Sequence, residues 1–352
     1  MKRLLLLALA LVMVLAMMTA CGTNAAPAAT EKPVDTAAAT AEPTEAPAAE
    51  ATPEATPEQA ASFDESNPLA AATLAGPTGM GMIQMFGNPA YDIALQASPD
   101  EITPKIISGE VSVATIPSNL AAVLYNKMKG GISIVSVNTM GVLYILENGD
   151  TVSSIDDLAG KTIYATGQGS TPEYALKKVL EANGVDDVTV EYMGAHADLA
   201  NAMAAGEVDL ALLPEPFVST VLAKNPDVKV KIDINTEWQK IFGEDAGMPM
   251  GVTVVSNKFA ANKADMDKLI ADYSASVNYV TTDTDAAAAD IVAQGIVGAE
   301  PIAKAAIPRC GISFITGEQC KAILADYFAV MFESNPDSLG GAIPDDAIYY
   351  MP

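Results

Sequence analysis

Side chains on which many enzymes and nucleic-acid-binding proteins depend are scarce in this sequence. Its 352 residues include one histidine, His196, and two arginines, Arg3 and Arg309, and the formal net charge is −25. Binding to nucleic acid needs a basic footprint, so this acidic composition argues against it. The scarcity of arginine also argues against a guanidinium clamp for phosphate or carboxylate groups.

The single histidine limits the possible chemistry further. A Ser-His-Asp or Cys-His catalytic centre would have to use His196, and nothing in the sequence suggests a nucleophile beside it. We therefore predict that His196 is a surface residue. No set of several histidines and cysteines has the spacing of a metal site. The composition thus predicts no catalytic residues, no metal and no cofactor.

Only three cysteines are present, and the first follows an apolar N-terminal segment. Lys2 and Arg3 precede an unbroken apolar run over residues 4–17, and small residues then lead to Cys21. This pattern predicts a secretory signal peptide over residues 1–21 rather than a spanning helix. A cysteine at this place resembles the processing site of a bacterial lipoprotein, which implies an extracytoplasmic protein anchored to the cell membrane by lipid on Cys21. The alternative is an ordinary signal peptide with a chance cysteine.

The other two cysteines lie close together near the C-terminus. Cys310 and Cys320 would share an oxidising compartment, where a disulfide that closes a short loop can form. Two free thiols are the alternative, because the geometry that a disulfide needs cannot be read from the sequence. Both alternatives therefore stay open.

The segment after the signal is rich in alanine, proline, threonine and glutamate. Residues 22–67 contain a single aromatic residue, Phe63. Such a segment buries too little apolar surface to offset its ordering entropy, so we predict a disordered linker that holds a folded domain above the membrane. The remaining residues, 68–352, are numerous enough for one large core or two lobes.

An internal repeat indicates how the folded part is organised. Residues 109–127 align without a gap to residues 206–224, and each copy reads as a glycine turn, an apolar strand, a proline and a helix. The similarity extends upstream to strands predicted over 71–75 and 161–165. Other predicted strands cover 91–97, 132–138, 188–193, 228–232 and 251–255, and other predicted helices cover 100–108, 173–183, 196–205, 263–279, 283–294 and 318–333.

Alternating strands and helices predict an α/β fold with mostly parallel sheets flanked by helices. Two similar blocks predict two lobes with a cleft between them. Because the strands over 132–138 and 251–255 flank the second block, the chain is expected to cross between lobes there. We assign residues 68–142 plus 251–352 to the first lobe and residues 143–250 to the second.

In open α/β sheets, ligands bind beyond the carboxyl ends of the strands, so the repeat predicts two facing sets of loops. Helix N-termini in these loops can hold polar or anionic groups without arginine. The candidate ligand-binding residues of the first lobe are Thr78, Gly79, Met80, Met82, Ser118, Asn119 and Thr139. Those of the second lobe are Gly169, Ser170, Thr171, Glu173, Glu215 and Phe217. The alternatives are helix capping for Ser118, Ser170 and Thr171, and solvated surface for Glu173.

Several of these stretches carry a resemblance to a known family. Residues 76–82, 109–126, 138–144, 157–161, 167–174 and 212–217 resemble solute-binding lipoproteins of ABC importers, of the nitrate/sulfonate/taurine/thiamine-precursor type. The resemblance covers nearly all of 68–352 and implies the type II periplasmic-binding fold. It also implies a monomer that captures a small molecule between closing lobes and delivers it to a membrane permease. Aromatic residues, methionines and helix N-termini suit a flat or partly apolar ligand with one polar end, such as a pyrimidine-like ring or a sulfonate.

Two other functions remain as alternatives to a binding protein that is not an enzyme. Related two-lobed folds include a pyrimidine synthase and a dehydratase of menaquinone synthesis, so an enzyme on the same fold is the first. Those enzymes are cytoplasmic, and the predicted lipoprotein signal counts against this function. The second is a surface receptor that senses or adheres without transport.

Overall fold

The computed structural model describes residues 61–244 and 246–352, which lie within one compact unit of the chain. The predicted signal peptide over residues 1–21, its Cys21, and most of the predicted linker over residues 22–67 lie outside the described residues. Within the described part, no helix combines the length and the apolar character that crossing a membrane requires.

The end of the predicted linker packs on the folded part. Phe63 is only 4% exposed, and its ring centroid lies 5.3 Å from that of Tyr91 and 6.0 Å from that of Phe259. The hydroxyl of Ser62 donates to a carboxylate oxygen of Asp265 at 2.6 Å. As the one aromatic residue of the segment, Phe63 provides apolar surface that the rest of it lacks, so residues before Pro68 also pack on the folded part.

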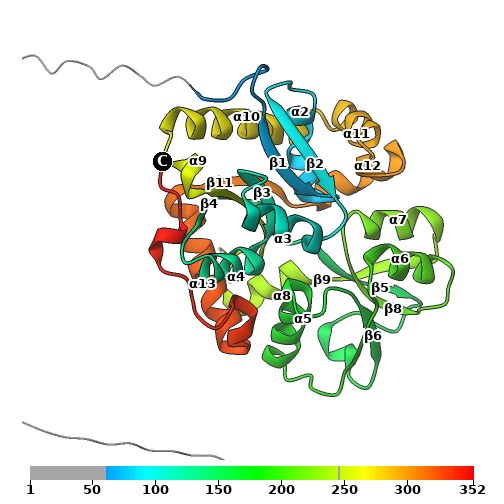
Figure 1. The fold of residues 1–352 in the computed structure, drawn as a ribbon. Helices are drawn as coiled ribbons and strands as arrows, with labels where there is room; N and C mark the ends of the chain where they lie inside the picture. Colours follow the sequence, from blue (N-terminus) through cyan, green and yellow to red (C-terminus); the bar gives the residue numbers. More distant parts are fainter. Residues whose placement is uncertain (1–60, 245) are drawn as a thin grey trace, which may run out of the picture. The chain divides into compact units, whose positions relative to one another are not determined.

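Two sheets form the framework of the molecule (Figure 1). The six-stranded sheet 1 has the order β11-β4-β10-β3-β1-β2, and the five-stranded sheet 2 has the order β7-β6-β8-β5-β9. The strands of sheet 1 are β1 (Leu69–Leu74), β2 (Tyr91–Gln96), β3 (Val113–Pro117), β4 (Ile132–Met140), β10 (Pro249–Ser256) and β11 (Ile312–Thr316). The strands of sheet 2 are β5 (Leu143–Asn148), β6 (Thr162–Ala165), β7 (Thr189–Tyr192), β8 (Leu210–Pro214) and β9 (Val228–Asp233).

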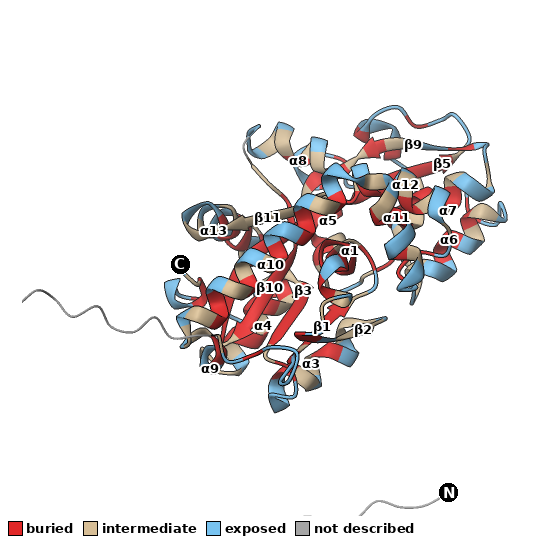
Figure 2. Ribbon diagram, turned by 90° about the horizontal axis from the view of Figure 1, so that it is seen from above, coloured by how far each residue is buried: buried red, intermediate tan, exposed pale blue. Residues whose placement is uncertain are grey.

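Helices cover both faces of each sheet. They are α1 (Pro77–Gly81), α2 (Ile83–Phe86), α3 (Pro99–Ser108), α4 (Ser118–Lys127), α5 (Thr171–Ala182), α6 (His196–Ala204), α7 (Phe217–Lys224), α8 (Ile234–Phe242), α9 (Asn257–Ala260), α10 (Lys263–Thr282), α11 (Thr284–Ala293), α12 (Glu300–Ala306) and α13 (Gly317–Ser334). Short 3₁₀ turns, η1 to η4, cover Ile155–Leu158, Ile307–Arg309, Pro336–Leu339 and Asp346–Ile348. Figure 2 shows buried residues concentrated on the strands and on helix sides. Every predicted strand and helix corresponds to one of these elements within a few residues, while the strands β5 and β11 and the helices α8, α9 and α12 were not predicted.

The two sheets match strand by strand. The order β2-β1-β3-β10-β4 of sheet 1 corresponds to β7-β6-β8-β5-β9 of sheet 2, and β11 is an addition at the edge of sheet 1. The repeated blocks supply β3 with α4 and β8 with α7. Within these matching strands, β10 and β5 alone pair antiparallel to their neighbours. The fold is therefore the predicted type II periplasmic-binding fold, in which most strands of each sheet run in the same direction and β10, β11 and β5 run against them.

The antiparallel strand of each sheet is supplied by chain that arrives from the other sheet. β5 follows β4 after Gly141 and Val142, and β10 follows α8 after residues 243–248. The two crossing segments lie together, since the amide of Gly141 donates to the carbonyl of Met248 at 2.9 Å. Gly141 has a φ of +29°, and a Cβ there would come within 2.4 Å of Asn235 side-chain atoms. Glycine is therefore required for this close approach.

Both remaining cysteines are buried free thiols, so the disulfide alternative is wrong. Cys310 precedes β11 and packs in the cluster around Met80, whereas Cys320 begins the buried side of α13. A five-residue strand extends about 17 Å, and a disulfide needs Cα atoms within about 7 Å. The extended strand between the two residues therefore keeps them apart.

Candidate functional site

The loops that follow β3 and β6 meet at the start of two helices. Asn119 in the first turn of α4 is 5% exposed, and Thr171 at the start of α5 is 1% exposed. The Thr171 hydroxyl donates to the Asn119 side-chain oxygen at 3.3 Å. The structure thus brings one candidate from each sheet into contact. We call this contact and its surroundings the Asn119–Thr171 junction.

The neighbouring candidates in these loops are held by their own backbone surroundings. The buried Ser118 hydroxyl donates to the carbonyl of Pro249 at 2.6 Å. In the glycine turn before α5, the Ser170 hydroxyl donates to the Gly167 carbonyl at 2.7 Å. The carboxylate of Glu173 accepts from the amide of Gly169 at 2.5 Å, on an exposed part of the turn. Positive φ angles of 77° and 73° at Gly167 and Gly169 explain the glycines.

Glu215, after β8, forms an ion pair that the sequence did not predict. Its fully buried carboxylate accepts from Arg309 Nε at 2.6 Å and from the amide and hydroxyl of Ser219 at 3.1 and 3.0 Å. Arg309 Nη2 also donates to the Ser219 hydroxyl at 2.8 Å. Burial raises the pKa of Glu215, and Arg309 opposes that rise. The signal in the sequence was that Arg309 is the single arginine of residues 68–352.

The ion pair is a second contact between the two sheets. Arg309 lies in η2 directly before β11 of sheet 1, whereas Glu215 directly follows β8 of sheet 2. The hydroxyl of Tyr144, on β5, donates to the Arg309 carbonyl at 3.3 Å. Helix α12 also packs against α7 on this side. The two strand-end regions are therefore closed onto each other.

Thr78 and Thr139 gather around a glycine of β10. The Thr139 hydroxyl donates to Asn138 Oδ1 at 3.0 Å, and the Asn138 amide donates to Thr253 at 3.1 Å. A Cβ on Gly251 would lie 2.6 Å from Asn138 Oδ1 and 2.9 Å from Thr78 Cγ2. Asn138 is therefore the centre of a buried polar cluster at the carboxyl end of β4.

Three of the candidates point away from the strand-end loops into the core. Met80 and Met82 are fully buried, and the thiol of Cys310 lies 3.7 Å from the Met80 sulfur. A Cβ on Gly79 would lie 2.7 Å from the carbonyl oxygen of Leu74. The prediction that Gly79, Met80 and Met82 contact ligand is corrected here, because the short helix α1 turns these residues toward α10, α11 and β1.

His196 is not the surface residue that the sequence predicted. It is half-buried, hydrogen-bonded through Nδ1 to the hydroxyl of Thr166, and its ring centroid lies 5.3 Å from that of Phe217. Burial lowers the pKa of His196 to about 4. The neutral imidazole therefore helps to position Phe217, the remaining candidate of sheet 2.

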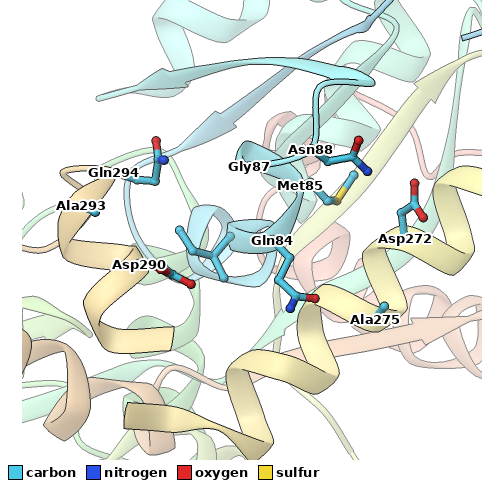
Figure 3. Close-up of a pocket in the computed structure, with 10 residues that line it drawn as sticks. Gln84, Met85, Gly87, Asn88, Asp272, Ala275, Asp290, Ala293 and Gln294 are labelled. Carbon is cyan, nitrogen blue, oxygen red and sulfur yellow. The ribbon is translucent and has the colours of Figure 1, made fainter. Parts of the chain in front are cut away.

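Open grooves lie elsewhere on the surface. One of about 490 Å³ lies between α2, α10 and α11, with Gln84, Asn88, Asp272 and Asp290 on its walls (Figure 3). Another of about 600 Å³ lies beside α5 and β7 and includes Glu173. Within the described residues, no three histidine, cysteine or carboxylate side chains gather as a metal site. The candidate site is thus a closed, polar interface between strand ends.

Solved structures of similar fold include several solute-binding proteins. An ABC transporter protein from Parabacteroides distasonis aligns with a TM-score of 0.69 at 22% identity, over 80% of this chain and 98% of that chain. The periplasmic aliphatic sulphonate binding protein SsuA from Escherichia coli gives 0.64 at 14%, over 81% and 92%. The alkanesulfonate-binding protein SsuA from Xanthomonas axonopodis pv. citri, bound to MOPS, gives 0.58 at 15%, over 79% and 94%. At these identities, the likeness shows the fold.

A comparison with curated proteins finds no match. A family model described as menaquinone biosynthesis, VitK2_biosynth, matches residues 82–328. This range runs from just before α2 into α13 and includes all of sheet 2, every strand of sheet 1 except β1, the Asn119–Thr171 junction and the Glu215–Arg309 ion pair. Since the match spans well over half of the chain, the chain belongs to the menaquinone biosynthesis family.

Proposed function

We propose that the chain is the extracytoplasmic substrate-binding lipoprotein of an ABC importer. It captures a small organic solute between two lobes, residues 68–142 plus 251–352 and residues 143–250, and delivers the solute to a membrane permease. Lipid on Cys21 anchors it to the cell membrane, and the chain works as a monomer. The observation that carries this proposal is the meeting of the two strand-end loops at the Asn119–Thr171 junction.

Capture by closure needs contacts from both lobes, because a ligand shifts an open–closed equilibrium only through its different affinity for the two forms. The two crossing segments, next to each other at Gly141 and Met248, are suited to act as the hinge. On closure, side chains from both sheets surround the solute. The contact of Asn119 with Thr171 supports this arrangement. Asn119 lies at the start of α4, which follows a strand of sheet 1, and Thr171 lies at the start of α5, which follows a strand of sheet 2.

For the solute, we propose a small organic molecule with one polar end, such as a sulfonate or a pyrimidine-like ring. The hydroxyl and amide groups of the junction support this class, because they bind polar groups without a basic side chain. The sulfonate-binding neighbours have the same fold, which is consistent with this choice.

An enzyme is the second candidate function, and the family match favours it. The group that such an enzyme would use first is the Glu215 carboxyl, because burial raises its pKa and thereby favours proton exchange nearer neutral pH. Arg309 and Ser219 already donate hydrogen bonds to that carboxylate, so they would have to move for Glu215 to reach a substrate.

The test is to identify what the purified full-length chain carries. Mass spectrometry after denaturation identifies the solute, and calorimetry measures its affinity for wild type and for Asn119→Ala and Thr171→Ala. We expect at least tenfold weaker binding in both variants, with cooperative unfolding retained. Equal binding in all three proteins would overturn the site. Chemical conversion of the solute by wild type would establish the enzyme instead.

A further inference from the structure

The hydroxyl of Tyr327 is a buried polar group that has no hydrogen-bond partner among the residues that the structure describes. Tyr327 lies on α13, and its exposed fraction is 1%. Nearly all buried hydroxyls in folded proteins are paired, because an unpaired one loses its hydration without compensation. The position of this hydroxyl therefore points to a partner that binds there.

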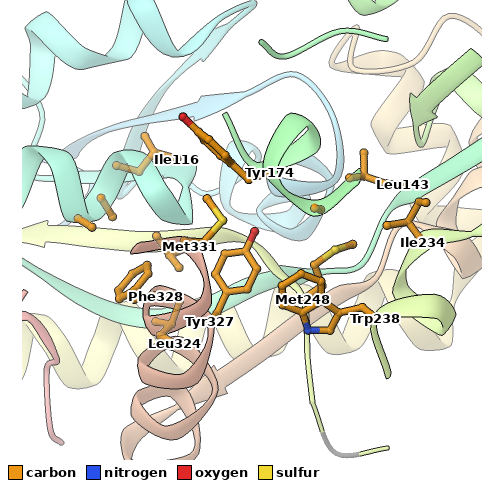
Figure 4. Packing of buried hydrophobic residues seen from close by; sticks show 14 of the residues in the cluster. Ile116, Leu143, Tyr174, Ile234, Trp238, Met248, Leu324, Tyr327, Phe328 and Met331 are labelled. Carbon is orange, nitrogen blue, oxygen red and sulfur yellow. The ribbon is translucent and has the colours of Figure 1, made fainter. Parts of the chain in front are cut away.

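The ring of Tyr327 points from α13 toward the start of α5. Figure 4 shows its hydroxyl directed away from the helix, in the region of Tyr174 and Met248. Its ring centroid lies 5.4 Å from that of Trp238. Helix α13 packs against α5, the helix that begins at Thr171. Burial raises the pKa of Tyr327 and the Thr171 side chain opposes that rise, in keeping with this packing. Tyr327 thus belongs to the Asn119–Thr171 junction.

The hydrogen bonds already present in the junction are long. Thr171 donates to Asn119 at 3.3 Å, and the Asn119 amide donates to the Ser338 carbonyl at 3.4 Å. The usual donor–acceptor distance is about 2.9–3.0 Å. These bonds are therefore weak enough to be exchanged for better ones with a ligand.

The junction offers donors and little negative charge. Helices α4 and α5, of 10 and 12 residues, both begin there, and their N-termini carry partial positive charge. The nearest acid in the first turn of α5, Glu173, accepts from the Gly169 amide on the exposed turn. An acceptor group placed between the two helix starts would meet the hydroxyls of Thr171 and Tyr327.

We propose that Tyr327 is a ligand-contacting residue that selects for an oxyanion, the carboxylate or sulfonate of a small organic acid. The oxyanion enters between the starts of α4 and α5, replaces Asn119 as acceptor for the Thr171 hydroxyl, and accepts a second hydrogen bond from Tyr327. This inference rests on the proposed function, since it names the chemical group recognised at the same site.

The test compares two tyrosines that are alike except in position. Tyr273, on α10, is also 1% exposed and also has an unpaired hydroxyl among the described residues, but it lies in the sheet 1 core near Gly81 and the Asn138–Thr253 pair rather than at the Asn119–Thr171 junction. Calorimetry would measure the affinity of full-length wild type, Tyr327→Phe and Tyr273→Phe for butanesulfonate and butyrate, with 1-butanol as the uncharged probe.

We expect wild type and Tyr273→Phe to bind at least one anion better than 1-butanol. Tyr327→Phe should bind that anion about 10-fold to 100-fold more weakly, as the loss of a hydrogen bond to a charged group implies. Which anion binds decides between carboxylate and sulfonate. Without ligand, Tyr327→Phe should melt at the wild-type temperature or above, because it removes an unpaired hydroxyl.

Three results would overturn the inference: no anion binding by wild type, equal affinities of wild type and Tyr327→Phe, or an equal loss in Tyr273→Phe. A lower melting temperature of Tyr327→Phe with unchanged affinity would show that the hydroxyl binds structural water instead. The co-purified solute separates the two proposals. If wild type and Tyr327→Phe carry equal amounts of it, the inference fails while the proposed function stands.

Discussion

Removing the guanidinium of Arg309 is expected to destabilise the protein in a pH-dependent way. Its Nε lies 2.6 Å from a Glu215 carboxylate that is fully buried, while the Arg309 side chain is 36% exposed. Loss of one partner from a fully buried pair costs about 3–5 kcal/mol. Solvent around Arg309 screens part of that interaction, so we expect Arg309→Met to lose about 2–3 kcal/mol of unfolding free energy at pH 8.

The dependence on pH follows from the Glu215 carboxyl. Burial raises its pKa in the folded protein, and without Arg309 the pKa rises further. A carboxyl with a higher pKa in the folded than in the unfolded state binds its proton more tightly when folded. The contribution of this carboxyl to the unfolding free energy is thus most favourable below its pKa in the unfolded chain, about 4.3. It declines as the pH rises through its pKa in the folded protein. The deficit of Arg309→Met should therefore shrink toward pH 5.

Urea unfolding followed by circular dichroism at pH 5 and pH 8 measures both effects. Lys304→Met is the matched control, because Lys304 pairs with Asp285 at 3.0 Å through exposed side chains on the neighbouring α12. An exposed pair contributes about 0–1 kcal/mol. The double variant Arg309→Met/Glu215→Gln should recover most of the lost stability, since it buries no charge. Equal losses at both pH values, or no recovery in the double variant, would refute the reasoning.

Three further predictions test other parts of the molecule. Phe63→Ala should lower the unfolding free energy by about 2–4 kcal/mol, because the ring is buried against Tyr91 and Phe259; an unchanged urea midpoint would contradict this packing. His196, with a folded pKa near 4, takes up protons mainly on unfolding, so wild type should lose stability between pH 6.5 and 4, and His196→Gln should lose less over that range; parallel pH profiles would contradict it. Cys21→Ser should move the protein from the membrane fraction to the soluble extracytoplasmic fraction on cell fractionation; retention in the membrane would exclude the lipid anchor.

The sequence predicted the strands and helices of the repeat because their signals are local. Residues 109–127 and 206–224 became β3 with α4 and β8 with α7, and the order of the elements predicted two α/β lobes. The type II fold itself was implied by the family resemblance. The edge strand β11 escaped prediction because all five of its residues are of intermediate burial, which gives no alternation of apolar and polar positions. The interior strand β5 was missed too, because its residues are nearly all buried and likewise show no alternation.

The candidate site was predicted less completely because its contacts join distant residues. Asn119 and Thr171 were found from the strand-end rule, since they begin the helices that follow β3 and β6. The partnership of Glu215 with Arg309 spans 94 positions, and no local pattern predicts it. Met80 was misplaced because a glycine-rich turn can direct side chains into the core or into a cleft, and only tertiary packing decides between them.

The repeat also relates the site to the proposed hinge. Ser118 and Glu215 occupy equivalent positions in the two copies. Each donates a hydrogen bond to the backbone at the start of an antiparallel strand, β10 for Ser118 and β5 for Glu215. The Ser118 hydroxyl donates to the carbonyl of Pro249, the first residue of β10, at 2.6 Å. The Glu215 amide donates at 3.0 Å to the carbonyl of Val142, directly before β5.

These two bonds assign different roles to neighbouring candidates. Any bending of the crossing segments at Gly141 or near Met248 moves the chain to which Ser118 and Glu215 are bonded, and therefore changes the distance between the loops that follow them. Asn119 is the next residue after Ser118, so its distance from Thr171 changes with the same motion. A ligand held at the Asn119–Thr171 junction would thus favour the closed arrangement of the crossing segments, as capture between two lobes requires.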